Sequence, residues 1–237
     1  MKKKVKKIIL LTLLILLLLL VIVFTYKLVW YRKVINAGKI IRTADNYLYE
    51  FIQYAKMTNP VTNEESDNIH RTQYLVKDDV RVVKNYVSND IDNLEYKYFL
   101  YEKEGVLINE KDKTFSIQSE PYIQYQKGVM VNYMMPEFWN DELSFFENLK
   151  YFLVYKYWDR IMGTNIEFEN IDGRDTIIFR EKYCNIYFDA ETLIAYKVTD
   201  AESGEENLIY EYRLELDVVT DEDITIPELN QYKQIVY

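Results

Sequence analysis

The first 33 residues constrain this chain most, because they decide on which side of a membrane the rest of it folds. From Ile8 to Phe24 one polar residue, Thr12, interrupts an apolar run. With the apolar residues just after it, the run reaches the about 20 residues that a helix needs to cross roughly 30 Å of hydrocarbon. A buried helix of a soluble protein is the alternative, but a leucine run without a polar face is not typical of one. We therefore predict a transmembrane helix.

The flanks of this run indicate that it is retained, and in which orientation. The first alanine is Ala37, so the small-x-small cleavage site of a signal peptide is missing, and the one cysteine, Cys184, is far from a lipoprotein position. Five lysines precede the run and three basic residues follow it, a bias that places the N-terminus in the cytoplasm. We expect a single-pass cell-membrane protein, with a cytoplasmic tail and signal-anchor in residues 1–33 and an extracytoplasmic domain in residues 34–237 that folds without the anchor.

The charge of the domain limits its partners. Eight of the 29 Lys and Arg residues and none of the 38 Asp and Glu residues lie in the first 33 positions, so the domain has a net charge of −17. Such a surface repels nucleic acid and anionic lipid. The single cysteine also forbids an internal disulfide, and we predict that Cys184, inside an apolar run, is a buried hydrophobic residue.

The spacing of apolar residues predicts two helices in this domain. Steps of three and four favour a first helix over Val34–Met57, continuous with the span, with Ile41, Ala44, Leu48, Phe51 and Ala55 on one face. We expect it to end before Pro60. A second helix is predicted from about Asp141 to Arg160, covering the sheet with Phe145, Phe146, Leu149, Phe152 and Leu153.

Alternating patterns predict strands around the second helix. A hairpin turns at Lys77-Asp78-Asp79, and a meander follows over residues 95–117. After Gly163 strands are expected at 165–171, 175–180, 184–189, 193–199 and 208–219, the first two joined by an Asp172-Gly173 turn. Thr220 is predicted to cap a short turn. This order of elements predicts an α+β domain with a curved antiparallel sheet covered by helices.

In this order of elements the chain resembles the lipoprotein-carrier superfamily, the half-barrel type of the bacterial LolA and LolB proteins. The resemblance covers roughly residues 40–220 and rests on a covering helix followed by GRDTIIF, NIYFDAETLIAYKV, YEYRLELDVV and TDEDITIPEL. It implies a half-barrel sheet curled around an apolar cavity that takes acyl chains, and it marks no catalytic residue. Carriers of this type are soluble shuttles, whereas an anchored domain cannot ferry cargo. The resemblance therefore implies local capture, sensing or scaffolding.

Catalytic and metal signatures are missing from the sequence. His70 is the one histidine, no G-x-S-x-G, P-loop or G-x-G-x-x-G motif occurs, and zinc would need more His and Cys ligands. Asp90, Asp92 and Glu95 could hold calcium in one loop, but an acidic turn without the EF-hand glycine is the simpler interpretation. We expect no cofactor and no metal, and we expect a surface position for His70.

An aromatic and methionine-rich stretch is the most suggestive candidate for ligand binding. Large rings and adaptable methionines around Pro136 would suit the mouth of a lipid or peptide pocket. Core and sheet packing is the alternative interpretation of the same residues. The candidate pocket-mouth residues are Tyr125, Met134, Met135, Trp139 and Phe146.

The sequence thus leaves two functions of different class. The domain is predicted to be a binding module rather than an enzyme, capturing a lipid, lipoprotein or envelope-protein partner. The alternative is an enzyme that uses carboxylates on a cell-envelope substrate, which two Asp or Glu side chains facing each other across a polar cleft would favour. A purely structural partner of another membrane protein is a third interpretation that the pattern does not separate from the first.

Overall fold

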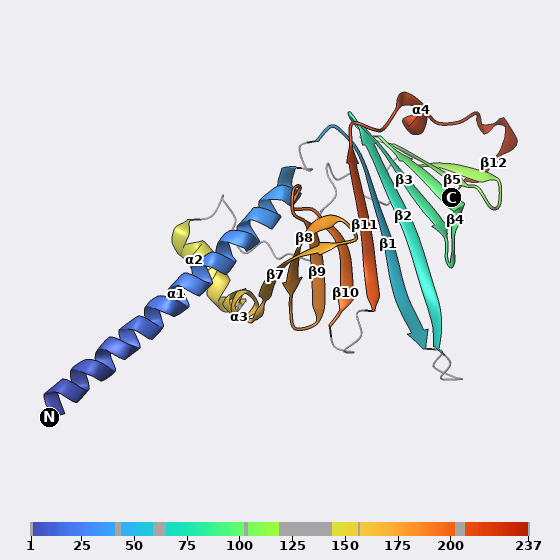
Figure 1. Ribbon diagram of the computed structural model, residues 1–237. Helices are drawn as coiled ribbons and strands as arrows, with labels where there is room; N and C mark the ends of the chain where they lie inside the picture. Colours follow the sequence, from blue (N-terminus) through green and yellow to red (C-terminus); the bar gives the residue numbers. More distant parts are fainter. Residues whose placement is uncertain are drawn as a thin grey trace.

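A long N-terminal helix leads into one large sheet, with short helices beside the long one and near the C-terminus (Figure 1). This α+β arrangement agrees with the predicted class. The computed structural model describes residues 2–40, 44–58, 65–101, 104–118, 144–155, 157–201 and 207–236.

Twelve strands of the described residues form a single open sheet, in the order β12-β6-β5-β4-β3-β2-β1-β11-β10-β9-β8-β7. Neighbours are antiparallel except β12 and β6, which are parallel. The strands are β1 Asn46–Thr58, β2 Glu65–Lys77, β3 Val80–Val87, β4 Asp90–Leu100, β5 Gly105–Asn109, β6 Thr114–Gln118, β7 Asn165–Ile171, β8 Arg174–Arg180, β9 Cys184–Asp189, β10 Ala195–Asp200, β11 Leu208–Leu216 and β12 Lys233–Gln234. The prediction that Asp90, Asp92 and Glu95 lie in one acidic loop is wrong, because all three belong to β4.

Several turns follow the predicted chemistry. Asp172 and Gly173 both have positive φ, 53° and 83°, as the predicted β7–β8 hairpin turn requires. In the β9–β10 turn the Asp189 carboxylate accepts the backbone N–H of Thr192 at 2.8 Å. Near the C-terminus the Asp223 carboxylate accepts the N–H of Thr220 at 2.9 Å, which completes the predicted cap of α4 (Asp221–Ile224).

The helix predicted over Val34–Met57 is wrong in its second half. Helix α1 (Lys2–Ile40) ends at Ile40, and β1 takes up the following residues in the middle of the sheet. β1 is rich in aromatic and β-branched residues, which suit strands, and it pairs with β2 on one side and β11 on the other. Two ladders of backbone hydrogen bonds and buried Tyr47 and Tyr49 therefore override the helical spacing.

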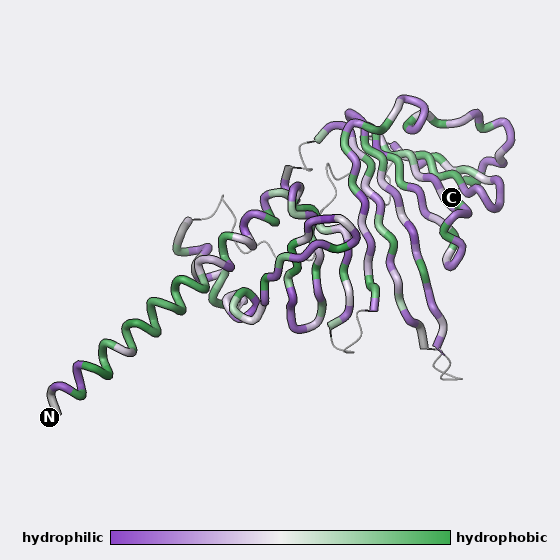
Figure 2. Tube along the Cα trace, in the orientation of Figure 1, coloured by the Kyte–Doolittle hydropathy of each residue, from purple (hydrophilic) through white to green (hydrophobic). Residues whose placement is uncertain are grey.

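The N-terminal part of α1 projects away from the sheet and, after a hydrophilic tip of lysines, is apolar (Figure 2). Its side chains from Ile8 to Val23 are exposed, and the helix is long and apolar enough to cross a membrane. The hydroxyls of Thr12 and Thr25 donate to the carbonyls of Ile8 and Val21, at 3.0 and 2.8 Å. Neither hydroxyl therefore needs a partner outside the helix in hydrocarbon.

The C-terminal part of α1 belongs to the core of the domain. Tyr31 and Val34 are fully buried against Phe179 of β8 and Phe188 of β9, and Leu28 packs against the same cluster. The helix is continuous across the predicted domain boundary between residues 33 and 34. A fragment that begins at residue 34 would lack the buried Tyr31, and the expectation that residues 34–237 fold without the anchor stays a prediction.

The predicted covering helix over 141–160 is two short helices, α2 (Phe145–Val154) and α3 (Tyr157–Gly163). They pack beside α1, which already occupies the adjacent face of the sheet. Phe152 contacts α1, whereas Phe146 and Leu153 are 79% and 56% exposed and do not face the sheet as predicted. The side chains of Phe145 and Leu149 lie outside the described part of the structure.

A second core cluster lies at the other end of the sheet. The segment after β11 crosses β2 to β6 and includes α4, the 3-10 helix η2 (Leu229–Gln231) and β12. Its Val219 is buried, and Ile226 and Leu229 pack against Leu75 and Phe99 of the sheet. The two ends of the sheet are thus covered by opposite ends of the chain, and the strands between them carry the candidate site.

Candidate functional site

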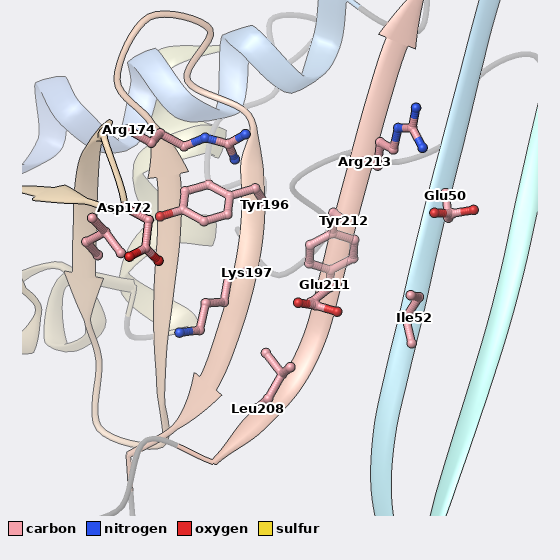
Figure 3. A pocket seen from close by; sticks show the side chains of 11 residues that line it. Glu50, Ile52, Asp172, Arg174, Tyr196, Lys197, Leu208, Glu211, Tyr212 and Arg213 are labelled. Atoms are coloured by element: carbon pink, nitrogen blue, oxygen red, sulfur yellow. The ribbon is translucent and has the colours of Figure 1, made fainter. Parts of the chain in front are cut away.

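A hollow of about 600 Å³ lies where β1, β11 and β10 run side by side, bordered by the tip of the β7–β8 hairpin (Figure 3). Its wall combines charges of both signs with the rings of Tyr196 and Tyr212 and the aliphatic Ile52 and Leu208. Six charged side chains contribute to the lining: Glu50, Asp172, Arg174, Lys197, Glu211 and Arg213.

Strand register explains why the charged residues of β1 and β11 share one side. Glu50 stands opposite Arg213, and Ile52 stands opposite Glu211. Directly opposed residues of an antiparallel pair project to the same face, and so do alternate residues along each strand. The β1–β11 pairing, between segments more than a hundred and fifty residues apart, therefore assembles this wall.

Glu50 is held in a network that reaches across β2 and β3. Glu50 is buried, with 7% of the residue exposed. Its carboxylate oxygen Oε2 accepts a hydrogen bond from Arg71 Nε at 2.9 Å and lies 2.8 Å from Arg71 Nη2. Gln73 Nε2 donates to the same oxygen. Tyr86 in turn donates to Gln73 Oε1 at 2.7 Å, and the Arg71 guanidinium lies over the Tyr86 ring. Glu50 is thus a paired, structurally engaged carboxylate at the edge of the hollow.

Glu211 is also engaged, by a neighbour on β1. Tyr54 Oη donates to Glu211 Oε2 at 2.6 Å. Burial, together with this bond to a carboxylate, raises the pKa of Tyr54 to about 12. The phenol therefore remains a protonated donor at neutral pH, and Glu211 remains its acceptor.

The three cations of the hollow are positioned by aromatic rings and by two carboxylates, one of which is Asp189, 3.8 Å from Arg174 Nε. Arg174 lies over the Tyr196 ring, with 4.5 Å from its Cζ to the ring centroid, and Lys197 Nζ lies 5.0 Å from the centroid of Tyr187. Arg213 donates to Glu215 at 2.9 and 2.6 Å. The ring contacts hold Arg174 and Lys197 in place without neutralising their charge, whereas Arg213 is already paired with a carboxylate.

A second hollow of about 520 Å³ adjoins the first. The two share Arg174, Tyr196, Tyr212 and Arg213 in their walls, and the second extends to Ala37 near the end of α1. Ala37 lies 13 positions after Phe24, the last residue of the apolar run, or about 20 Å along a helix that rises 1.5 Å per residue. The second hollow therefore reaches the same helix that carries the apolar run, beyond the end of that run.

Of the five predicted pocket-mouth residues the structure describes Phe146, so the pocket mouth stays a prediction. Tyr125, Met134, Met135 and Trp139 lie outside the described residues. Phe146 lies on α2 beside α1 and lines neither hollow. Within the described residues, the two hollows are also not the wholly apolar cavity that the resemblance implied, because charged side chains line both.

The histidine and the cysteine line neither hollow. His70 is exposed on β2 opposite Gln53 of β1, as expected of a surface histidine. Cys184 is buried, as predicted, and burial followed by the nearby Glu181 carboxylate raises the pKa of its thiol to about 11. The thiol is therefore protonated at neutral pH and is a poor nucleophile.

Sequence reasoning missed the charged wall, although part of its signal was visible. In YEYRLEL the residues Glu211, Arg213 and Glu215 alternate with apolar ones, which indicates a charged strand face. Glu50 could not be placed, because its segment was predicted to be helical.

No protein-family model matches this sequence, and no curated protein matches it. Distant matches exist among solved structures. An uncharacterized conserved protein from Thermus thermophilus aligns with a TM-score of 0.39 and 6% identity, over 86% of this chain and 97% of that one. MucB in complex with MucA(peri) aligns with a TM-score of 0.36 and 11% identity, over 87% of this chain and 61% of that one. A DUF1329 family protein from Desulfovibrio piger aligns with a TM-score of 0.28 and 10% identity, over 83% and 96%.

Proposed function

We propose that this protein is a membrane-anchored extracytoplasmic binding module that captures a charged segment of an envelope partner in the hollow across β1, β11 and β10. The observation that carries this proposal is the lining of the hollow, in which three cations and three carboxylates surround two tyrosine rings. Sites with a few placed polar groups and aromatic walls are typical of specific ligand recognition. Capture beside the anchor requires no movement of the domain through the envelope.

The lining favours a polypeptide segment over an acyl chain. An acyl chain gains its binding energy from apolar burial and would have to displace water from Arg174, Lys197 and Glu211 without replacing their hydrogen bonds. A peptide with side chains of both signs can satisfy these groups and stack on Tyr196 and Tyr212. The acidic surface of the domain adds a long-range preference for basic segments.

Carboxylate chemistry is the second candidate, and one observation favours it. Glu50, Asp172 and Glu211 line the same hollow, as the enzyme hypothesis requires of paired acids. The hydrogen bonds of Glu50 and Glu211 weigh against it. Glu50 already accepts from Arg71 and Gln73, and Glu211 from Tyr54, so these oxygens serve as acceptors of protein donors. We therefore place binding first.

A photo-crosslinker at position 196 is expected to capture a polypeptide. Tyr196 lines both hollows and its replacement by p-benzoylphenylalanine in the full-length chain retains an aromatic ring there. We expect a discrete protein adduct in cells that make this chain, and we expect Lys197→Glu to reduce its yield, because the wall then lacks one of the cations that contact the anionic side chains of the captured segment. Gel analysis and mass spectrometry of the adduct are the measurements.

Position 183 provides the control. Tyr183 is 58% exposed and lines neither hollow, so the same crosslinker there should not give this adduct. Equal adducts from both positions, or a lipid adduct at position 196, would contradict the peptide-binding proposal. Glu211→Gln separates binding from catalysis. If the hollow is a binding site, this variant should still give the adduct at position 196, with a modestly lower yield. If the protein is an enzyme that uses this carboxylate, the variant should lose turnover of its envelope substrate.

The proposed anchor predicts a defined topology. Five lysines before the apolar run favour a cytoplasmic N-terminus, so the sheet should lie on the outer side. We expect protease added to intact spheroplasts to digest the domain while an N-terminal tag remains protected. Digestion that requires lysis would show the opposite orientation, and release of the whole domain into the medium would show that the run is a cleaved signal sequence.

A further inference from the structure

Helices α2 and α3 carry an unusual concentration of exposed apolar side chains. Phe146, Val154 and Leu153 are 79%, 64% and 56% exposed, and three aromatic residues of the same pair of helices and their junction, Tyr151, Tyr155 and Trp158, are exposed as well. Soluble surfaces rarely gather so many large apolar groups in one place unless something covers them.

Four of the exposed residues of α2 lie along one side of the helix. Phe146, Lys150, Leu153 and Val154 follow the spacing i, i+4, i+7 and i+8, which places them in one stripe. We call these four residues the α2 stripe. The opposite side of the helix points inward, where Asn148 is 1% exposed. The helix is thus amphipathic, with its apolar stripe directed away from the protein.

Contacts with α1 fix where α2 lies relative to the span. The rings of Phe152 and Phe24 meet edge to face with 6.1 Å between their centroids. One turn further along α1, Lys27 Nζ donates to the carbonyl of Met162, the penultimate residue of α3, at 2.7 Å. Figure 1 shows α2 crossing the middle of α1. The two short helices are therefore attached to α1 at the level of Phe24 to Lys27.

This level corresponds to the outer edge of the hydrocarbon. A helix crosses roughly 30 Å of hydrocarbon with about 20 residues, so a span that starts after Lys7 ends near Lys27. Tyr26 and Trp30, on α1, have the amphipathic rings that favour the membrane–water interface. The α2 stripe thus lies where headgroups meet acyl chains.

We propose that α2 is an interfacial helix that lies in the outer leaflet of the anchoring membrane, with Phe146, Leu153 and Val154 inserted among the acyl chains. Lys150, at the centre of the stripe, extends to the phosphates of the headgroups. The inference rests on the proposed membrane anchor and adds a second contact with the bilayer. A span alone lets the domain rotate and tilt, whereas a span with an interfacial helix holds the hollows at a fixed height and direction.

Spin labels on the full-length chain test this arrangement. In a Cys184→Ala background, Leu153→Cys places a label on the stripe, and Leu16→Cys places one in the middle of the span. The chain is reconstituted in vesicles of phosphatidylcholine and phosphatidylglycerol. Relaxation of each label by oxygen, which concentrates in the bilayer, is compared with relaxation by a water-soluble nickel chelate. We expect the label at position 153 to be relaxed more strongly by oxygen, as at position 16.

Position 117 is the matched control. Ile117 on β6 has the same 56% exposure as Leu153 but belongs to the far end of the sheet. A label there should respond more strongly to the nickel chelate. If position 16 reports lipid while positions 153 and 117 behave alike, the interfacial helix is wrong and the anchor stands. If position 16 reports water, the anchor is wrong and the inference falls with it. Spin–spin broadening between labels at position 153 would show that a second copy covers the stripe instead.

Discussion

Replacing Tyr31 by alanine is expected to lower the free energy of unfolding of the domain by about 3–5 kcal/mol, the usual loss for a large buried aromatic residue. Tyr31 is fully buried, and its ring packs 5.0 Å from the ring of Phe179. Its hydroxyl donates to Glu181 at 2.8 Å and lies 2.5 Å from the Thr164 hydroxyl. The substitution therefore leaves a cavity and removes a partner from buried polar groups at the same place.

Tyr26 is the matched control, since it lies on the same helix one turn and a half earlier and is 48% exposed. Tyr26→Ala should change the free energy of unfolding by less than about 0.5 kcal/mol. Urea denaturation of the full-length chain in detergent micelles, followed by tryptophan fluorescence, measures both variants. Similar losses for the two would mean that α1 does not form part of the core.

A milder change separates packing from hydrogen bonding at the same position. Tyr31→Phe keeps the ring and removes only the hydroxyl, so Glu181 retains the bidentate contact with Arg160 at 2.9 and 2.7 Å. We expect this variant to lose about 1–2 kcal/mol, the cost of one buried hydrogen-bond partner. A loss as large as that of the alanine variant would assign the effect to the polar network rather than to the ring.

The role of Tyr31 also changes where the domain begins. The sequence divides at residue 33, where the apolar and basic pattern ends, but the helix continues, and its residues between Phe24 and Ile35 pack into the core. Hydropathy reports the solvent that a segment meets, and it cannot tell which face of one continuous helix packs against a sheet formed much later in the chain. A single helix thus has a stretch long and apolar enough to cross a membrane at one end and a core element at the other.

Local signals in the sequence were reliable where the chemistry is local. The Asp172-Gly173 turn and the Thr220 cap depend on neighbouring residues, and both form as predicted. The prediction for the residues of β1 was wrong because their conformation depends on distant segments. The apolar residues of β1 fit both a helical and an alternating spacing, and the choice is made by β2 and by β11, the latter of which is remote in sequence.

The same limit explains the candidate site. The wall of the hollow is assembled from β1, β10, β11 and the β7–β8 turn. No sequence pattern within one of these segments predicts which other segments lie next to it. The sequence drew attention to aromatic and methionine side chains because such residues suit pockets. Alternating charges on a strand received less weight, because a solvent-exposed strand face is the simplest explanation of such a pattern. Only the strand register shows that these charges lie beside those of other strands.

Replacing Glu50 by alanine is expected to destabilise the sheet by about 3 kcal/mol, near the lower end of the cost of breaking a buried ion pair. The Glu50 side chain is 9% exposed and that of Arg71 is 21% exposed, so the guanidinium left behind is largely desolvated. It retains the carbonyl of Ile91 at 3.0 Å, the exposed carboxylate of Asp92 at 3.6 Å and the Tyr86 ring, which limits the loss. Chemical denaturation with the wild-type chain as reference gives the change.

Glu215 and a double variant make this expectation specific. The Arg213–Glu215 pair is equally close at 2.6 Å, but its side chains are 60% and 37% exposed, so Glu215→Ala should cost less than about 1 kcal/mol. Glu50→Leu combined with Arg71→Met removes both charges and should be less destabilising than Glu50→Ala, because no unpaired charge remains buried. If the double variant is the less stable one, the network contributes net stability to the middle of the sheet. If Glu50→Ala costs no more than Glu215→Ala, the hydrogen bonds of Glu50 contribute little, and they no longer weigh against a catalytic role for this carboxylate at the hollow.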